Sequence, residues 1–169
     1  HYNEAYGIVN ADCQRWLHSQ HHERATWDSS HATSDRNKDH ADGFDYYKRL
    51  PTSLGRVLEI GAGPFTQSQS IATRYPETEI GAGKHMSSIT LVDPNAVHYA
   101  NKVRNCYYRR GYFGLIEKSI PLIVMNEAAE NLLVPSLETD KYDTIIMVNT
   151  IEHVYDALIV LAKAVAMLK

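Results

Sequence analysis

A short apolar run that ends in two glycines constrains the fold of this chain more than any other sequence feature. Residues 56–60 (RVLEI) predict a buried strand, Gly61-Ala62-Gly63-Pro64 predicts a turn, and residues 66–74 predict a helix that ends before Pro76. A strand that enters a helix through Gly-x-Gly brings backbone N–H groups against a ligand with no side chain in the way. The string therefore predicts a βα unit whose connecting loop binds a ligand.

The same alternation of apolar runs and helical stretches continues to the end of the sequence. Further strands are expected at 89–92, 120–125 and 142–148, with helices at 96–109 and 154–168. The spacing is typical of an α/β fold in which helices cover both faces of a parallel sheet. We expect residues 51–169 to form this domain, with residues 76–88 as an inserted loop. In the last helix, an apolar face packed on the sheet is expected to consist of Val154, Leu158, Leu161, Val165 and Leu168.

The first fifty residues are polar and rich in histidine, and we interpret residues 1–50 as a helical cap. A helix is expected at 5–19, a loop or lid at 28–42 and a short helix at 44–50. The aromatic side chains of Trp27, Tyr46 and Tyr47 fit a substrate pocket and the core equally well. His18, His21 and His22 lack carboxylate or cysteine partners in register, so a polar surface is favoured over a metal site.

Composition limits the classes of partner. The net charge of -3 gives no general attraction to nucleic acid or to anionic lipid, and no run approaches the length of a membrane helix. The two cysteines, Cys13 and Cys106, have no C-x-x-C spacing, which favours reduced thiols in a cytoplasmic protein. We therefore expect a small-molecule partner, with neither a nucleic acid nor a membrane.

The residues around the glycine turn discriminate between nucleotide ligands. A dinucleotide loop carries a third glycine where this chain has Thr66, and Gly83-Lys84 is followed by His85, which does not fit a P-loop. We expect residues 81–84 to be a flexible loop. Glu59 would repel a pyrophosphate but suits a cationic ligand.

Residues 57–66 (VLEIGAGPFT) resemble motif I of the class I S-adenosylmethionine-dependent methyltransferases. The resemblance implies that the cofactor lies over this loop, with contacts from Glu59, Gly61, Ala62, Gly63, Pro64 and Thr66. Residues 91–95 (LVDPN) resemble the acidic strand end of the same family. There the resemblance implies that Asp93 binds the ribose and that Pro94 and Asn95 border the adenine.

Two later segments extend the resemblance. Residues 126–132 (NEAAENL) match the family at Ala129 and Glu130, whereas Ala128 replaces the aspartate that usually accepts from the adenine amino group, so Asn126 or Glu127 would have to serve. Residues 141–154 look like motif IV, which implies that this strand ends at the reacting centre and that Asn149 contacts the cofactor.

The residues after that strand bear on catalysis. His153 is the candidate base, because an imidazole titrates near neutral pH. Equally, Glu152 and His153 could only open the next helix. A related group of O-methyltransferases holds a divalent cation with a Glu-x-x-Glu-His cluster, but Asn149 stands in place of its first glutamate, so no metal is expected.

The family resemblance implies a Rossmann-like sheet of seven strands, and only four are expected here. The sheet is thus predicted to be truncated after the fourth strand, with a missing C-terminal segment or a second chain to complete it. The function implied is methyl transfer from S-adenosylmethionine to a small-molecule acceptor, with S-adenosylhomocysteine as product. The alternatives are a non-catalytic S-adenosylmethionine-binding or scaffold module and, less favoured, an NAD-dependent oxidoreductase fragment.

Overall fold

A computed structural model describes residues 13–28, 45–75, 83–103, 106–107, 112–115 and 118–169. The helices are α1 (Cys13–Asp28), α3 (Gln67–Arg74), α4 (Ala96–Lys102) and α5 (Ala157–Met167). The strands are β1 (Ser53–Ile60), β2 (His85–Val92), β3 (Tyr112–Leu115), β4 (Lys118–Met125) and β5 (Thr144–Ile146). Short 3-10 helices are η3 (Asp45–Arg49), η4 (Ala129–Asn131), η5 (Glu138–Asp140) and η6 (Ile151–His153).

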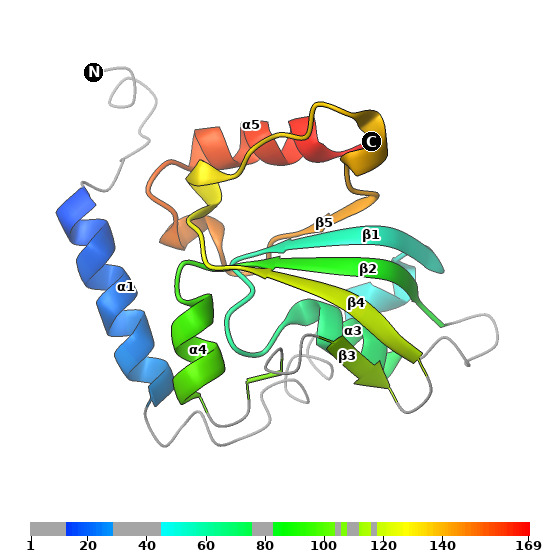
Figure 1. Ribbon diagram of the computed structural model, residues 1–169, viewed down its shortest axis with the longest axis horizontal. Coiled ribbons are helices and arrows are strands. Elements are labelled where there is room, and N and C mark those ends of the chain that lie inside the picture. The colour runs from blue at the N-terminus through cyan, green and yellow to red at the C-terminus, as the bar shows by residue number, and fades with distance from the viewer. Residues whose placement is uncertain (1–12, 29–44, 76–82, 104–105, 108–111, 116–117) are drawn as a thin grey trace.

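The five strands form one sheet in the order β3-β4-β2-β1-β5. All neighbours pair in parallel except β3, which is antiparallel to β4. From β1 the chain moves to β2 and β4 on one side and returns to β5 on the other, so the strand order reverses beside β1 (Figure 1). In open sheets of this kind, ligands bind outside the carboxyl ends of the strands at such a reversal. The expected α/β fold with a parallel sheet is confirmed, and this arrangement is compatible with a Rossmann-like fold.

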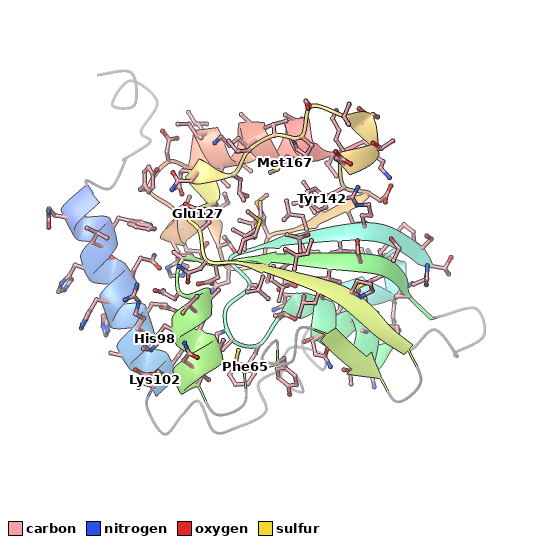
Figure 2. All side chains as sticks on the ribbon, viewed as in Figure 1. Phe65, His98, Lys102, Glu127, Tyr142 and Met167 are labelled. Atoms are coloured by element: carbon pink, nitrogen blue, oxygen red, sulfur yellow. The ribbon has the colours of Figure 1, made fainter. Side chains whose placement is uncertain are left out.

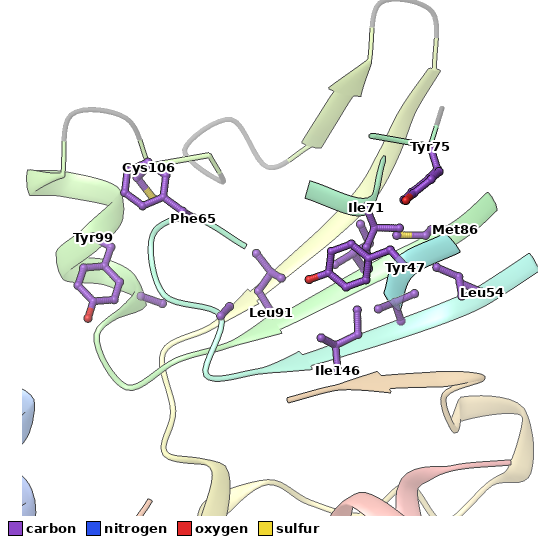
Figure 3. Packing of buried hydrophobic residues seen from close by; sticks show 14 of the residues in the cluster. Tyr47, Leu54, Phe65, Ile71, Tyr75, Met86, Leu91, Tyr99, Cys106 and Ile146 are labelled. Carbon is purple, nitrogen blue, oxygen red and sulfur yellow. The ribbon is translucent and has the colours of Figure 1, made fainter. Parts of the chain in front are cut away.

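Helices cover the two faces of the sheet (Figure 1). On one face, Ile71 of α3 and Tyr99 of α4 pack with Val57, Ile89 and Leu91 of the strands, in the cluster shown in Figure 3. On the other face, Val160, Ala164 and Met167 of α5 pack on Leu58 and Ile60. Successive residues of β1 point to opposite faces, and both faces are buried, which explains its continuous apolar run.

The face of α5 that packs on the sheet differs from the predicted one. Leu158, Leu161, Val165 and Leu168 are all more than a third exposed, and Val165 is 72% exposed. The helix is apolar on nearly all sides (ALIVLAKAVAM), so helical spacing alone could not identify the buried face. Its start is also later than expected, at Ala157, because the Asp156 carboxylate accepts from the Ile159 N–H as N-cap.

Several predicted boundaries were wrong for identifiable reasons. The helix expected at 96–109 ends at Lys102, where Val103 adopts an extended backbone. Residues 85–88, expected in a loop, form the first half of β2 because they pair with the start of β1. The strand expected at 142–148 is reduced to Thr144–Ile146, although Tyr142 forms a separate bridge to Leu168.

The amino-terminal helix also lies elsewhere than predicted. It runs from Cys13 to Asp28, so it does not end at Ser19, whereas residues 5–12 and 29–42 lie outside the described part of the chain. It lies beside α4 across the carboxyl ends of the strands (Figure 1). Its three histidines, His18, His21 and His22, are exposed, consistent with a polar surface.

The short helix expected near Pro51 is present as η3 and packs against the domain. Tyr47 is buried in the core, whereas the Tyr46 side chain lies outside the described part of the chain. A flexible loop was expected at residues 81–84, of which 81 and 82 lie outside the described part of the chain. Lys84 is buried, and its Nζ donates to the Leu50 carbonyl at 2.6 Å. This lysine therefore provides a hydrogen-bond donor for the backbone carbonyl groups at the end of η3. None of the described helices has the length and apolar character needed to cross a membrane.

Candidate functional site

A cavity of about 340 Å³ lies at the carboxyl ends of β1, β2, β4 and β5. This volume is at the lower end of the roughly 300–1,000 Å³ typical of small-molecule sites. The segments that follow the four strands form its floor and walls, and one face of α1 covers it. The cavity therefore occupies the place that the strand order alone favours for a ligand.

The two glycines of the β1–α3 loop are needed for different structural reasons. Gly61 has a φ of +71°, and a Cβ there would lie 2.4 Å from Thr150 Cγ2. Gly63 has a φ of +56°, but no atom lies within 4 Å of the place its Cβ would occupy. Gly61 is required because Thr150, in the segment after β5, packs against it, whereas Gly63 leaves its backbone open toward the cavity. At Gly63 a ligand can therefore approach the backbone with no side chain in the way, as the sequence predicted.

Glu59 closes the start of α3. One carboxylate oxygen accepts from the Gln67 N–H at 2.6 Å, and the other accepts from the Ser68 N–H at 2.8 Å and from the Ser68 hydroxyl. The next N–H of the helix start, that of Gln69, donates to the Thr66 hydroxyl oxygen. These are the groups with which a helix start would bind a phosphate. Glu59 and Thr66 together leave no donor at this helix start for an anionic ligand.

Asp93 connects the end of β2 to the glycine loop. Its Oδ2 accepts from the Gly63 N–H at 3.0 Å, and its Oδ1 accepts from the Asn95 N–H at 2.7 Å. Asp93 and Glu59 are both nearly inaccessible to solvent yet belong to the cavity lining. The two carboxylates thus lie side by side beneath the cavity, one on each side of the loop.

Burial changes the titration of both acids. Desolvation raises the pKa of Glu59 from 4.5 to about 7, partly opposed by its bonds to Ser68 and Gln67. Desolvation likewise raises the pKa of Asp93 from 3.8 to about 6, with a further rise from the charge of Glu23 and an opposing effect from Arg24. A cation in the cavity would favour the ionised form of each acid, so the site fits a cationic group better than an anionic one.

The wall after β4 contains the segment in which Ala128 stands in place of an aspartate. Ala128, Ala129 and Glu130 line the cavity, and Glu130 Oε1 accepts from the Tyr155 N–H at 2.6 Å and the Asp156 N–H at 3.0 Å. Of the two substitutes for the missing aspartate, Glu127 also lines the cavity; it is labelled in Figure 2 in the segment that leaves β4. Asn126 does not, and its Oδ1 accepts from the Val97 N–H.

The wall after β5 holds a residue with an unusual backbone. Asn149 has a φ of 54°, the one positive value among the described residues other than glycine. Asparagine tolerates this conformation better than most residues, and such geometry tends to occur at functional sites. The hydroxyl of Thr150 fixes the turn by donating to the Ile60 carbonyl at 3.0 Å. His153, at the end of η6, also lines the cavity and has an exposed side chain.

The cover consists of a single face of α1. The residues that reach the cavity recur at helical spacing: Trp16, Ser19, Gln20, Glu23 and Trp27. The Trp16 indole N–H donates to the His153 carbonyl at 3.1 Å, and Gln20 Oε1 accepts from the Asn95 amide at 2.9 Å. Arg24 Nε donates to the same Asn95 side chain. Side-chain bonds thus hold the helix across the cavity, between the segments that follow β2 and β5.

Every candidate site residue except Thr66 lies in this lining. The structure brings together Glu59, Gly61, Ala62, Gly63, Pro64, Asp93, Pro94, Asn95, Ala129, Glu130, Asn149 and His153. Thr66 is fully buried outside the lining and caps α3 instead. Trp27, for which two interpretations were open, lines the cavity and packs on Phe65 with ring centres 5.6 Å apart.

Sequence reasoning missed most of the cover. Its one available signal was the helical spacing of Trp16, Gln20, Glu23 and Trp27, but the segment has no coherent apolar face to suggest a buried side.

Within the described ranges, no group of three or more histidine, cysteine or carboxylate side chains could hold a metal ion. The lining offers carboxylates, aromatic rings and the unobstructed backbone at Gly63. No protein-family model and no curated protein sequence matches this chain.

Proposed function

We propose that this chain binds S-adenosylmethionine in the covered cavity and transfers its methyl group to a small-molecule acceptor. The observation that carries the proposal is the occupied start of α3. Because Glu59 and Thr66 take the N–H groups that a pyrophosphate would need, the loop suits a ligand whose nearby groups are positive. This disfavours a dinucleotide and favours a sulfonium cofactor, as the resemblance of residues 57–66 implies.

Each remaining part of the lining has a role in this proposal. Asp93 would accept hydrogen bonds from the ribose hydroxyls, and the open backbone at Gly63 would lie against the amino acid portion. Glu127 offers a polar group to an adenine in a wall otherwise formed by Ala128 and Ala129. The cofactor supplies a methyl group made electrophilic by its positive sulfur.

The residues of the chain act by orientation, exclusion of water and proton transfer. An in-line displacement gains most from holding the nucleophile and the carbon in register, which is the effect of a cavity covered by α1. The His153 imidazole, on the cavity wall near Asn149, is placed to accept a proton from an acceptor at its free ring nitrogen.

A comparison of ligands tests the proposal. S-adenosylhomocysteine is expected to raise the melting temperature in a saturable manner, whereas NAD at the same concentration leaves it unchanged. A larger shift with NAD would contradict the proposal and favour the oxidoreductase alternative. Binding without methyl transfer to any acceptor would favour the non-catalytic module.

Substitution of Asp93 tests the site itself. Asp93→Asn keeps the shape but removes the charge, and a loss of about 1.5–3 kcal/mol in S-adenosylhomocysteine binding is expected, the scale of a charged hydrogen bond. Asp140→Asn, at an exposed carboxylate in η5, is the matched control and should bind as the parent does. Calorimetry on both variants measures the difference, and equal affinities would remove Asp93 from the site.

A further inference from the structure

The charge of the cavity lining has one sign. Its acidic side chains come from Glu23, Glu59, Asp93, Glu127 and Glu130. No described lining residue is a lysine or an arginine. Arg24 lies next to the lining, where its Nε donates to Asn95 and its charge partly offsets the burial of Asp93. A guest of net negative charge would meet repulsion from most of the wall, whereas a guest of net positive charge would be attracted.

Three of these carboxylates already have structural partners in the backbone. Glu59 accepts from the start of α3, Asp93 accepts from Gly63 and Asn95, and Glu130 accepts from Tyr155 and Asp156. Their positions are fixed by the fold, so they set the potential of the cavity rather than adapt to a guest.

Glu23 differs from these three because it is on the cover. Its Oε1 accepts from the Trp27 indole N–H at 2.7 Å, and within the described part of the chain its Oε2 has no hydrogen-bond partner. The side chain is half-buried and lines the cavity. The indole orients one oxygen of this carboxylate and leaves the other available to a guest.

Aromatic rings accompany this carboxylate. Both tryptophans of the chain, Trp16 and Trp27, line the cavity, together with Tyr99 and Phe65. Tryptophan is the ring that attracts ammonium groups most strongly, and the attraction grows when water is excluded. A carboxylate with a free oxygen beside aromatic walls is the chemistry that recognises an organic ammonium ion.

We propose that the methyl acceptor of this site is a basic amine with an apolar body, held as its ammonium ion by Glu23 and Trp27. The inference rests on the proposed function and names its substrate class. Before transfer, the ammonium ion loses one proton, for which the imidazole of His153, in the same cavity lining, is the base that the chain offers. The nitrogen lone pair then forms the N–C bond as the C–S bond breaks, and the sulfur keeps the bonding pair. The positive charge passes from sulfur to the methylated nitrogen, and the thioether product is neutral at sulfur.

Intrinsic fluorescence can test the inference without turnover, because both tryptophans lie at the cavity. Two probes of similar size and opposite charge, 2-phenylethylamine and 3-phenylpropionate, are titrated into the protein with and without saturating S-adenosylhomocysteine. The amine is expected to bind at least about tenfold more tightly than the carboxylate. Equal affinities, or tighter binding of 3-phenylpropionate, would overturn the inference.

Variants locate the effect. Glu23→Gln is expected to weaken amine binding about five- to twentyfold, with S-adenosylhomocysteine affinity changed less than twofold, and Glu23→Asp to recover part of the loss. Glu152→Gln, which removes the same charge from an exposed side chain outside the lining, should leave amine binding unchanged. A loss of S-adenosylhomocysteine binding in Glu23→Gln with amine binding intact would assign Glu23 to the cofactor and overturn the inference.

The two proposals fail in different ways. Failure of S-adenosylhomocysteine to bind, with the amine preference intact, would refute the proposed function and leave a cavity selective for amines. Binding of S-adenosylhomocysteine without amine preference would refute the acceptor class alone.

Discussion

The floor and the cover of the cavity are built by different means. In the floor, Glu59 and Asp93 accept hydrogen bonds from backbone N–H groups of the β1–α3 connection. The two N–H groups bonded to Glu59 lie only eight and nine positions after it in the sequence. In the cover, Trp16 reaches His153 at a separation of 137 residues and Gln20 reaches Asn95 at 75. The floor is thus fixed by carboxylates bonded to backbone N–H groups next to the paired strands, and the cover is attached by a few side-chain bonds to distant segments. A segment attached like the cover opens at a lower free-energy cost than one built like the floor.

The largest effect is expected from a substitution in the floor. Gly61→Ala adds a Cβ that would lie 2.5 Å from Thr150 Oγ1, at a φ of +71°. The left-handed backbone alone costs about 1–2 kcal/mol, and the collision adds to it, so a loss of at least about 3 kcal/mol is expected. Thermal unfolding should show a fall in melting temperature of roughly 6–12 °C.

Gly63→Ala is the matched control for that substitution. Its backbone strain is similar, but the new Cβ meets no atom within 4 Å, so a loss of only about 1–2 kcal/mol is expected. Equal losses in the two variants would show that the contact with Thr150 does not hold the floor.

An intermediate effect is expected from pH. The folded chain holds the protons of Glu59 and Asp93 up to pKa values of about 7 and 6, whereas the unfolded chain releases them near 4.5 and 3.8. Their contribution to stability is therefore full below about pH 4 and is lost as the pH rises through 6 to 7. Melting temperatures measured from pH 5 to 8 should fall, and the slope should be smaller in the variant Glu59→Gln/Asp93→Asn.

Asp143 provides a control of opposite sign for the pH series. Its bond to Lys169, 2.7 Å long, and its bond from the Arg56 N–H lower its pKa. Its contribution is present at neutral pH and is lost only in acid, as the pH falls below its ordinary value. Asp143→Asn should therefore leave the slope between pH 5 and 8 unchanged.

The smallest effect on stability is expected in the cover. Trp16→Phe keeps an aromatic ring against Tyr155 but removes the N–H that donates to His153. Less than about 1 kcal/mol of global stability should be lost, whereas amide hydrogen exchange in α1 should become faster. Leu17→Ala, on an exposed position of the same helix, should change neither quantity. A global loss as large as that of Gly61→Ala would abolish the distinction between floor and cover.

The sequence by itself determined the floor. The run from Val57 to Thr66 implies a strand, a turn and a helix start, because its apolar residues and two glycines can be read locally and the bonds of the helix start join residues fewer than ten positions apart. Asp93 followed from the same logic, because the carboxyl ends of adjacent parallel strands must meet at one edge of the sheet. Thr66 is the exception, since its hydroxyl serves equally well as a ligand contact and as an N-cap, and the helix takes it.

Only the tertiary structure decided the cover, the extent of the strands and the buried face of α5. Nothing local to Glu23 says that it lies over Asp93, because that proximity depends on where α1 docks, 70 residues away along the chain. For α5, an almost uniformly apolar sequence allows several faces to be buried, and contact with Leu58 and Ile60 selects the one with Val160, Ala164 and Met167. Local bonds can be read from spacing, whereas docking is decided by the sum of many distant contacts.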